Sequence, residues 1–162
     1  DESEGRLAML LALPVSRLRW AAVEAGGTGV ACAVLAAVAG LALWAGTLLV
    51  HAPLGTRPAL LGALNLLPVG LLCLGAALLA LGWAPRLVVP VGALPAVGGF
   101  LLLVLADSLH WPARVRELSP FAHVAAVPSV DPDVHGAVGL LGLAVLLAVL
   151  GGIGYRRRDL RG

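Results

Sequence analysis

Histidine and cysteine are the residues of this sequence that most readily bind metals or transfer protons. The four histidines are far apart, and none follows another at the HxH or HxxxH spacing of many metal sites: His51, His110, His123 and His135. Cys32 and Cys73 both lie inside long apolar runs, where a cysteine is typically a small packing residue. We therefore expect no metal site and no disulfide, with a pH sensor as the alternative role for the histidines.

Motifs for catalysis are also missing. The sequence contains no Lys, so it cannot form a Walker A loop, which needs a Lys on the phosphates. Neither G-x-S-x-G nor H-E-x-x-H occurs. Glu24 is the only candidate for an ionisable group in a span, but it lies at the end of an apolar run rather than at mid-membrane. We expect a chain that is not an enzyme, binds no cofactor itself and depends on an outside energy source.

The composition indicates a membrane protein. Only 12% of the residues are charged, about half the fraction typical of soluble domains. Four uncharged runs are long enough to cross the hydrocarbon layer as helices, which satisfy their own backbone hydrogen bonds there: residues 25–50, 59–83, 87–106 and 136–155. The predicted fold class is all-α, a polytopic membrane protein with four transmembrane helices. A net charge of +2 gives no support for nucleic-acid binding.

The arginines predict the orientation of these spans. One side of the membrane would carry Arg6, Arg17, Arg19, Arg86, Arg156, Arg157, Arg158 and Arg161. The other side would carry Arg57, Arg114 and Arg116. Because basic residues concentrate on the cytoplasmic side, both ends of the chain are predicted to be cytoplasmic, in a multi-pass protein of a cell membrane.

Prolines and one long connection interrupt the spans. Pro68 is expected to break the second span and Pro95 to kink the third. The external stretch of residues 107–135 is predicted to hold a short helix, capped by Asp107 or Ser108, that ends near Leu118. The apolar SPFAHVAAVP that follows is expected to sit in the interface or to re-enter the bundle, and to cap its outer mouth.

The segment EGRLAMLLALPVSRLRW stands before the first span, too short and too charged to cross a bilayer. Acidic residues open it, where they suit the helix dipole, and Leu7, Leu10 and Leu11 recur at the spacing of one helix face. Pro14 ends the helix, and a turn leads to the first span. This pattern predicts a short amphipathic helix on the cytoplasmic surface. An inert helix that rests on the lipid headgroups is the alternative.

The same string, E-G-R-L-x-x-L-L-A-x-P-V-S-R, closely resembles the cytoplasmic loop of type-2 ABC exporter permeases, which precedes a span. SPFAHV, the later V-P and D-P-D, and the closing GYRRRDL resemble the C-terminal part of polyketide-antibiotic exporter permeases. The resemblance covers nearly the whole chain, although the middle spans match only in hydropathy.

The resemblance implies a coupling helix and turn in residues 1–19 and a transmembrane permease domain in residues 20–162. The helix would dock into a separate ATP-binding subunit that holds ATP and magnesium. The matching positions are Glu4, Gly5, Arg6, Leu7, Leu10, Leu11, Pro14, Val15, Ser16 and Arg17. Ala8 departs from the acidic residue common there, which questions a salt bridge from that position. In the family this loop lies between the second and third spans of a six-span unit, so this chain would hold spans three to six, which fits a first residue that is Asp rather than Met. Its other partners would be the N-terminal spans or a second permease copy, and membrane lipid. The resemblance also implies a bacterial cell membrane.

The implied function is ATP-driven export of an amphipathic compound, such as a drug or a polyketide antibiotic. Alternatives are a non-transport anchor or assembly subunit whose surface helix binds lipid or a partner, and a membrane enzyme or secondary carrier. Within the ABC class, lipid or peptide cargo is equally compatible with an apolar lining.

Overall fold

Helices make up most of the part of the chain that the structure describes. The computed structural model describes residues 17–125, 127, 130 and 132–158, and this part contains no strand. Four of its helical segments are long and apolar enough to cross a membrane: Ala22–Leu49, Thr56–Trp83, Pro85–Ser108 and Val134–Arg156. They coincide with the four predicted runs, so the all-α, multi-pass class is confirmed. The division between residues 1–19 and 20–162 stays a prediction.

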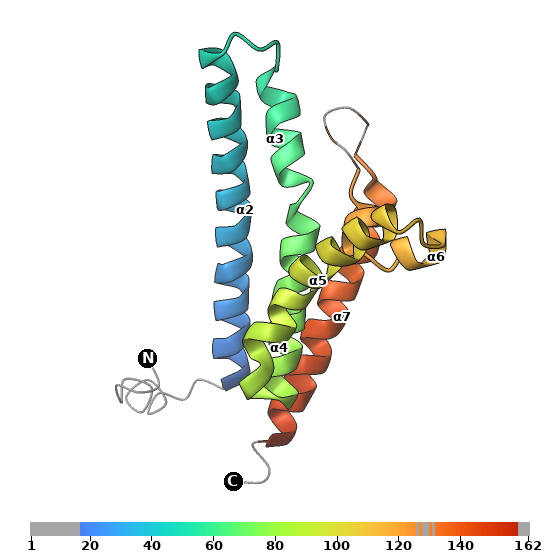
Figure 1. Ribbon diagram of the computed structural model, residues 1–162. Helices are drawn as coiled ribbons and strands as arrows, with labels where there is room; N and C mark the ends of the chain where they lie inside the picture. Colours follow the sequence, from blue (N-terminus) through green and yellow to red (C-terminus); the bar gives the residue numbers. More distant parts are fainter. Residues whose placement is uncertain (1–16, 126, 128–129, 131, 159–162) are drawn as a thin grey trace.

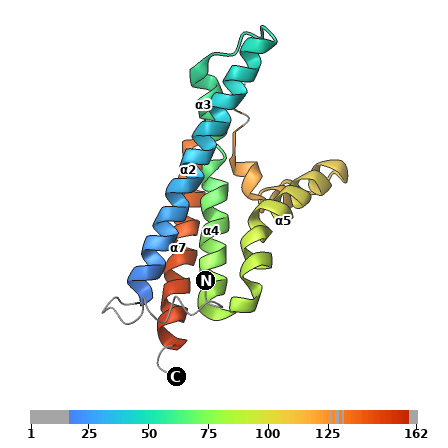
Figure 2. The same cartoon turned by 90° about the vertical axis from the view of Figure 1, so that its left-hand side faces the viewer.

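The first span forms an antiparallel hairpin with the start of the second. Helix α2 (Arg17–Leu49) runs without a break, turns back at residues 50–55, and is followed by α3 (Thr56–Leu64). Gly40 is buried where the two helices meet, and a Cβ there would lie 3.0 Å from the Leu60 Cα atom. Figures 1 and 2 show that this hairpin extends beyond the rest of the bundle. We call that end the outer end, and the opposite end, where α2 begins and α7 finishes, the inner end.

The second span is broken in two, as Pro68 predicts. Helix α3 ends at Leu64, and α4 (Leu67–Trp83) begins three residues later with Pro68 in its first turn. The Leu66 amide bonds to the Ala63 carbonyl, one residue closer than in an α-helix. Proline has no amide hydrogen, so the ladder cannot continue through it, and the first turn of a new helix is where proline is tolerated.

The core of the bundle lies between α4 and α7 (Val134–Arg158), which make the most extensive interhelical contact in the described chain. Gly75 and Gly82 on α4 lie directly against the α7 backbone, where a Cβ would collide with the carbonyls of Ala144 and Gly151. Without a hydrophobic driving force between helices in lipid, such close backbone approach is a main source of association. The buried side chains around this contact are Val69, Leu72, Leu140 and Ala144.

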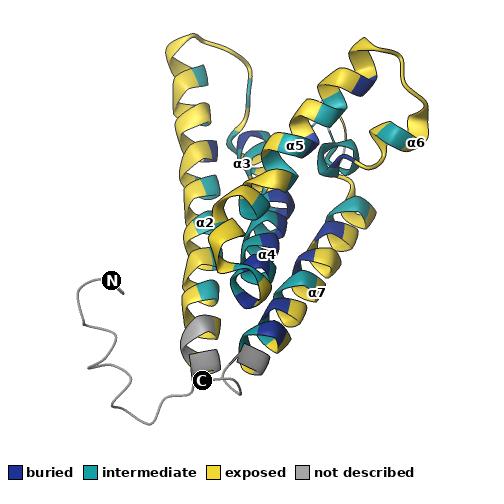
Figure 3. Ribbon diagram, turned by 60° about the horizontal axis from the view of Figure 1, so that its bottom comes forward, coloured by how far each residue is buried: buried dark blue, intermediate teal, exposed yellow. Residues whose placement is uncertain are grey.

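The third span leaves the inner end of α4 through a short 3-10 helix, η2 (Pro85–Leu87). Helix α5 (Val88–Ser108) contains Pro95 and bends along its length (Figure 2). Its last turns swing away from α4 toward the outer segment (Figure 1). Helix α2 is exposed along most of its length (Figure 3), as expected of a span that faces lipid or further protein.

The predicted cap of the external helix is wrong. Asp107 and Ser108 belong to the last turn of α5, and α6 (Ala113–Arg116) is a four-residue helix that begins after Pro112. The apolar run carries α5 past the predicted end of the span. The Asp107 carboxylate instead accepts from Arg116 Nε at 3.0 Å, in an ion pair that is more than half exposed and therefore contributes little stability.

The close approach of α4 and α7 gives a direct test. Replacing Gly75 by Val drives two methyl groups into the Ala144 carbonyl, and overpacking of this kind costs about 1–3 kcal/mol or more. We expect Gly75→Val to lower the apparent melting temperature in detergent by several degrees, measured by fluorescence-detected size exclusion. The matched control is Gly142→Val, because Gly142 on α7 has no atom within 4 Å of its would-be Cβ. An equal loss in both variants would contradict the packing described.

Candidate functional site

The predicted coupling residues lie almost wholly outside the described residues. Only Arg17 is placed, and its backbone begins α2. The docking role of the segment from Glu4 to Ser16 therefore stays a prediction. What the structure adds is the element that follows it, since α2 continues for 33 residues to Leu49. The range contains no proline, so no residue in it removes a backbone hydrogen bond and kinks the helix.

Helix α2 is attached unevenly along its length. Its contact with α3 is extensive, its contact with α4 is smaller, and it barely touches α7. The strong contacts lie toward the outer end, where Gly40 meets α3. At the inner end a groove separates α2 from α4 and α7. Helix α2 is thus anchored at one end and loosely packed at the end that adjoins the predicted coupling segment.

At the outer end, the apolar part of the external stretch re-enters the bundle. This is one of the two placements predicted for it, the other being the membrane interface. The segment contains η3 (Pro120–His123), and it begins at Ser119, which is completely buried. The Ser119 hydroxyl donates to the Gly99 carbonyl at 2.7 Å and accepts from the Phe121 amide at 3.2 Å. Pro120 packs over Gly99 on α5, where a Cβ would lie 2.7 Å from the proline ring.

The re-entrant segment also closes onto the core and onto the break in the second span. Phe121 and Val124 pack against the buried cluster between α4 and α7, and the Phe121 ring meets Phe100 edge-on at 6.1 Å. The Asn65 side-chain amide, at the break, donates to the Ala125 carbonyl at 2.7 Å. We call residues 119–125 the outer plug, because they join α4, α5 and α7 at one point.

Two residues of this region had no role in the sequence interpretation. Asn65 was one of the few polar residues in a span, and its position three residues before Pro68 was the available signal. Asp133 accepts from the Gly136 amide at 3.0 Å and so caps the start of α7. An Asp before an apolar helical run is the usual signature of such a cap. The Gly136 position also lets the His123 carbonyl lie close to α7.

The histidines are not brought together. His51 and His110 adopt positive φ angles of 53° and 52°. After each histidine, the next backbone amide donates to the carbonyl five residues before it: Ala52 donates to Thr47, and Trp111 donates to Ala106. These are Schellman-type helix ends, in which a non-glycine residue occupies the left-handed position. His123 Nε2 lies 2.8 Å from the Glu117 carbonyl. In the described part of the chain, no three residues of metal-ligating type form a cluster, and Cys32 and Cys73 are both free.

The arrangement therefore contains no group of described side chains suited to bond chemistry. It contains the long helix α2, which packs mainly on α3, a closely packed pair of helices, α4 and α7, and the outer plug.

Comparison with known proteins gives a family and one relative. The family described as "Multidrug efflux system permease Rv1217c, C-terminal domain" matches residues 1–156. The multidrug efflux system permease protein Rv1217c of Mycobacterium tuberculosis is 31% identical over 166 aligned positions, which cover 99% of this chain. The chain spans about 30% of the length of that relative. No solved structure is significantly similar to the chain.

The outer plug can be tested at Ser119. Ser119→Ala removes two hydrogen bonds from a buried position, each worth about 1 kcal/mol, so local opening becomes about tenfold or more frequent. We expect faster backbone hydrogen exchange in peptides that cover the outer plug, measured by mass spectrometry. Thr47→Ala is the control, because the Thr47 hydroxyl bonds only to Trp44 within its own helix. Unchanged exchange in Ser119→Ala would show that the plug is not held by this residue.

Proposed function

The chain belongs to the family of the C-terminal domain of the multidrug efflux system permease Rv1217c, and we propose that it is the membrane-spanning part of an ATP-driven ABC exporter. A separate ATP-binding subunit would hold ATP and magnesium. The cargo would be an amphipathic compound such as a drug or a polyketide antibiotic. Because the chain spans about 30% of its relative, the remaining spans, or a second permease copy, are expected as further partners.

The observation that carries this proposal is the relation between the predicted coupling segment and α2. The helix begins at Arg17, the last residue of that segment, and crosses the membrane unbroken. Its inner end has little contact with α7. A displacement of the coupling segment would therefore move α2, and the groove at the inner end gives this helix room to move. The Rv1217c relative, a multidrug efflux permease, supports transport as the purpose of that movement.

The mechanism we propose has three steps. ATP binding closes the partner subunits, and their motion displaces the coupling segment at the inner face of the cell membrane, where both ends of the chain would lie. Helix α2 tilts about its outer contact with α3, while α4 and α7 stay together. The outer plug then loosens through its attachment at Asn65, because α3 continues directly into that residue. Allosteric coupling of this kind requires two sites and one element with two states.

The experiment replaces two charged residues of the coupling segment, Glu4→Ala with Arg17→Ala, in the permease assembled with its ATP-binding subunit. Coupling free energies of about 1–3 kcal/mol correspond to changes of roughly 5- to 150-fold. We expect substrate-stimulated ATP hydrolysis and transport to fall about tenfold or more, while the basal hydrolysis of the partner subunit is kept.

Arg86→Ala is the matched control, since it removes a charge at the inner end from η2. That variant is expected to retain stimulation and transport. Full activity of the double variant would refute the coupling role. A permease that purifies without any subunit bearing a Walker A motif would instead favour an anchor or assembly role.

A further inference from the structure

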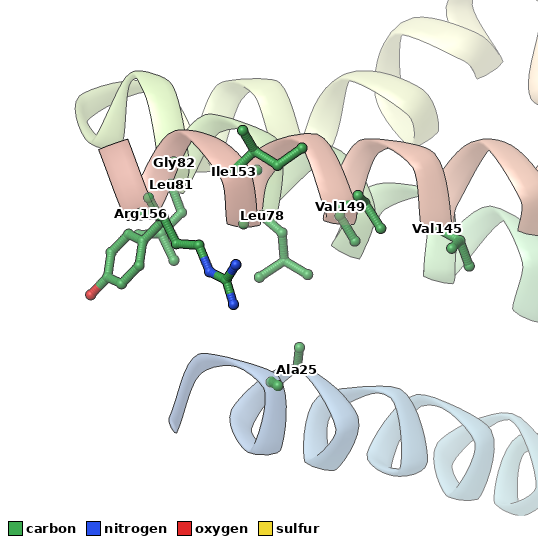
Figure 4. Close-up of a pocket in the computed structure, with 13 residues that line it drawn as sticks. Ala25, Leu78, Leu81, Gly82, Val145, Val149, Ile153 and Arg156 are labelled. Carbon is green, nitrogen blue, oxygen red and sulfur yellow. The ribbon is translucent and has the colours of Figure 1, made fainter. Parts of the chain in front are cut away.

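An apolar groove with a volume of about 520 Å³ lies at the inner end, between α2 on one side and α4 with α7 on the other. Ala22 and Ala25 line it from α2, Leu78 from α4, and Val149 from α7. Figure 4 shows Ala25 facing Leu78 and Val149 across the open space. The volume falls within the range of about 300–1,000 Å³ that is usual for small-molecule sites.

The groove follows from the packing of the three helices. The glycine contacts bring α4 and α7 together so closely that no space remains between them. Among the described side chains of α2, those that line the groove are Ala22 and Ala25, which are too small to reach α4 and α7. Filling this space needs a molecule with an apolar part, because nearly all of the lining is aliphatic.

One charge marks the groove. Among the described residues that line it, Arg156, in the last turn of α7, is the only charged one, and Tyr155 is the other that carries a polar group. Figure 4 shows the Arg156 guanidinium reaching across the groove toward α2. No described carboxylate forms an ion pair with Arg156. A cation beside an aliphatic groove complements a molecule with an apolar tail and a negatively charged head, and it repels a cationic amphiphile.

We propose that the groove binds an anionic phospholipid of the inner leaflet, with an acyl chain between α2 and α7 and its phosphate at Arg156. The acyl chain alone gives little selectivity, because its free energy hardly changes when it moves from the apolar bilayer into an apolar groove. The selectivity comes from the charge, and the cytoplasmic leaflet is the one that carries anionic lipids. This proposal depends on the predicted orientation and not on ATP-driven export. The lipid would fill the space into which α2 moves.

The test uses the intact permease in nanodiscs of equal parts phosphatidylglycerol and phosphatidylcholine with identical acyl chains. The permease is then released from the nanodiscs, and the lipids that remain bound to it are counted by native mass spectrometry. One Arg–phosphate contact at the membrane surface corresponds to a preference of about fivefold. We expect the wild-type protein to retain phosphatidylglycerol about fivefold over phosphatidylcholine, and Arg156→Gln to retain the two equally.

Two further variants separate the groove from the general charge of the surface. Arg86→Gln removes the same charge at the inner end from a residue outside the groove, and is expected to keep the preference. Ala25→Phe fills the groove from α2 and is expected to lose both lipids, with Ala22→Leu as a milder filling variant. Both alanines are on the sparsely packed inner part of α2, so the fold should tolerate the larger side chains.

Three results would overturn the proposal. An unchanged preference in Arg156→Gln would show that this residue does not select the lipid. An equal loss in Arg156→Gln and Arg86→Gln would indicate a general attraction to the surface. Unchanged lipid retention in both filling variants would mean that the lipid binds elsewhere and that another part of the permease, or a second copy, occupies the groove.

Discussion

The contact between the backbones of α4 and α7 is the interaction on which the other features of the bundle depend. Gly75, Gly82 and Gly151 let the two helices approach to a separation that any side chain would prevent. In lipid, apolar side chains gain nothing by turning inward, so stability must come from dispersion at close range. The buried cluster lies along this contact, and the outer plug packs against it. A rigid pair at the centre gives the more loosely attached helices a fixed reference.

The two ends of the bundle differ in how closely the other segments are attached to α4 and α7. At the outer end, hydrogen bonds from Ser119 and Asn65 fix the plug to α5 and to the break in the second span. At the inner end, the described residues of α2 have little contact with α7, and a groove lies between the two helices. In the mechanism we propose, motion that enters at the inner end passes along α2 to its contact with α3. The break at Asn65 then lies where that motion would be passed on to the plug.

The sequence predicts the spans well because hydropathy and length alone decide whether a segment can cross lipid. It also predicts the break at Pro68, since a missing amide is a local property. The contact of Asn65 with Ala125 could not be predicted, because the two residues are 60 positions apart and nothing local relates them. The assignment of Asp107 and Ser108 as a cap was wrong because cap preferences are weak against an apolar run that continues the helix. His110 ends that helix in a left-handed conformation, a position more often taken by glycine.

The central claim is that α2 moves as a rod against a rigid pair of α4 and α7. The most direct measurement is the distance between spin labels at Ala22 and Val149, by pulsed electron resonance, in the assembled transporter after replacement of Cys32 and Cys73. A second label pair, at Leu74 and Leu146, reports on α4 against α7. We predict that ATP shifts the first distance distribution by several ångströms and leaves the second unchanged. An unchanged first distance, or an equal shift in both, would contradict the claim.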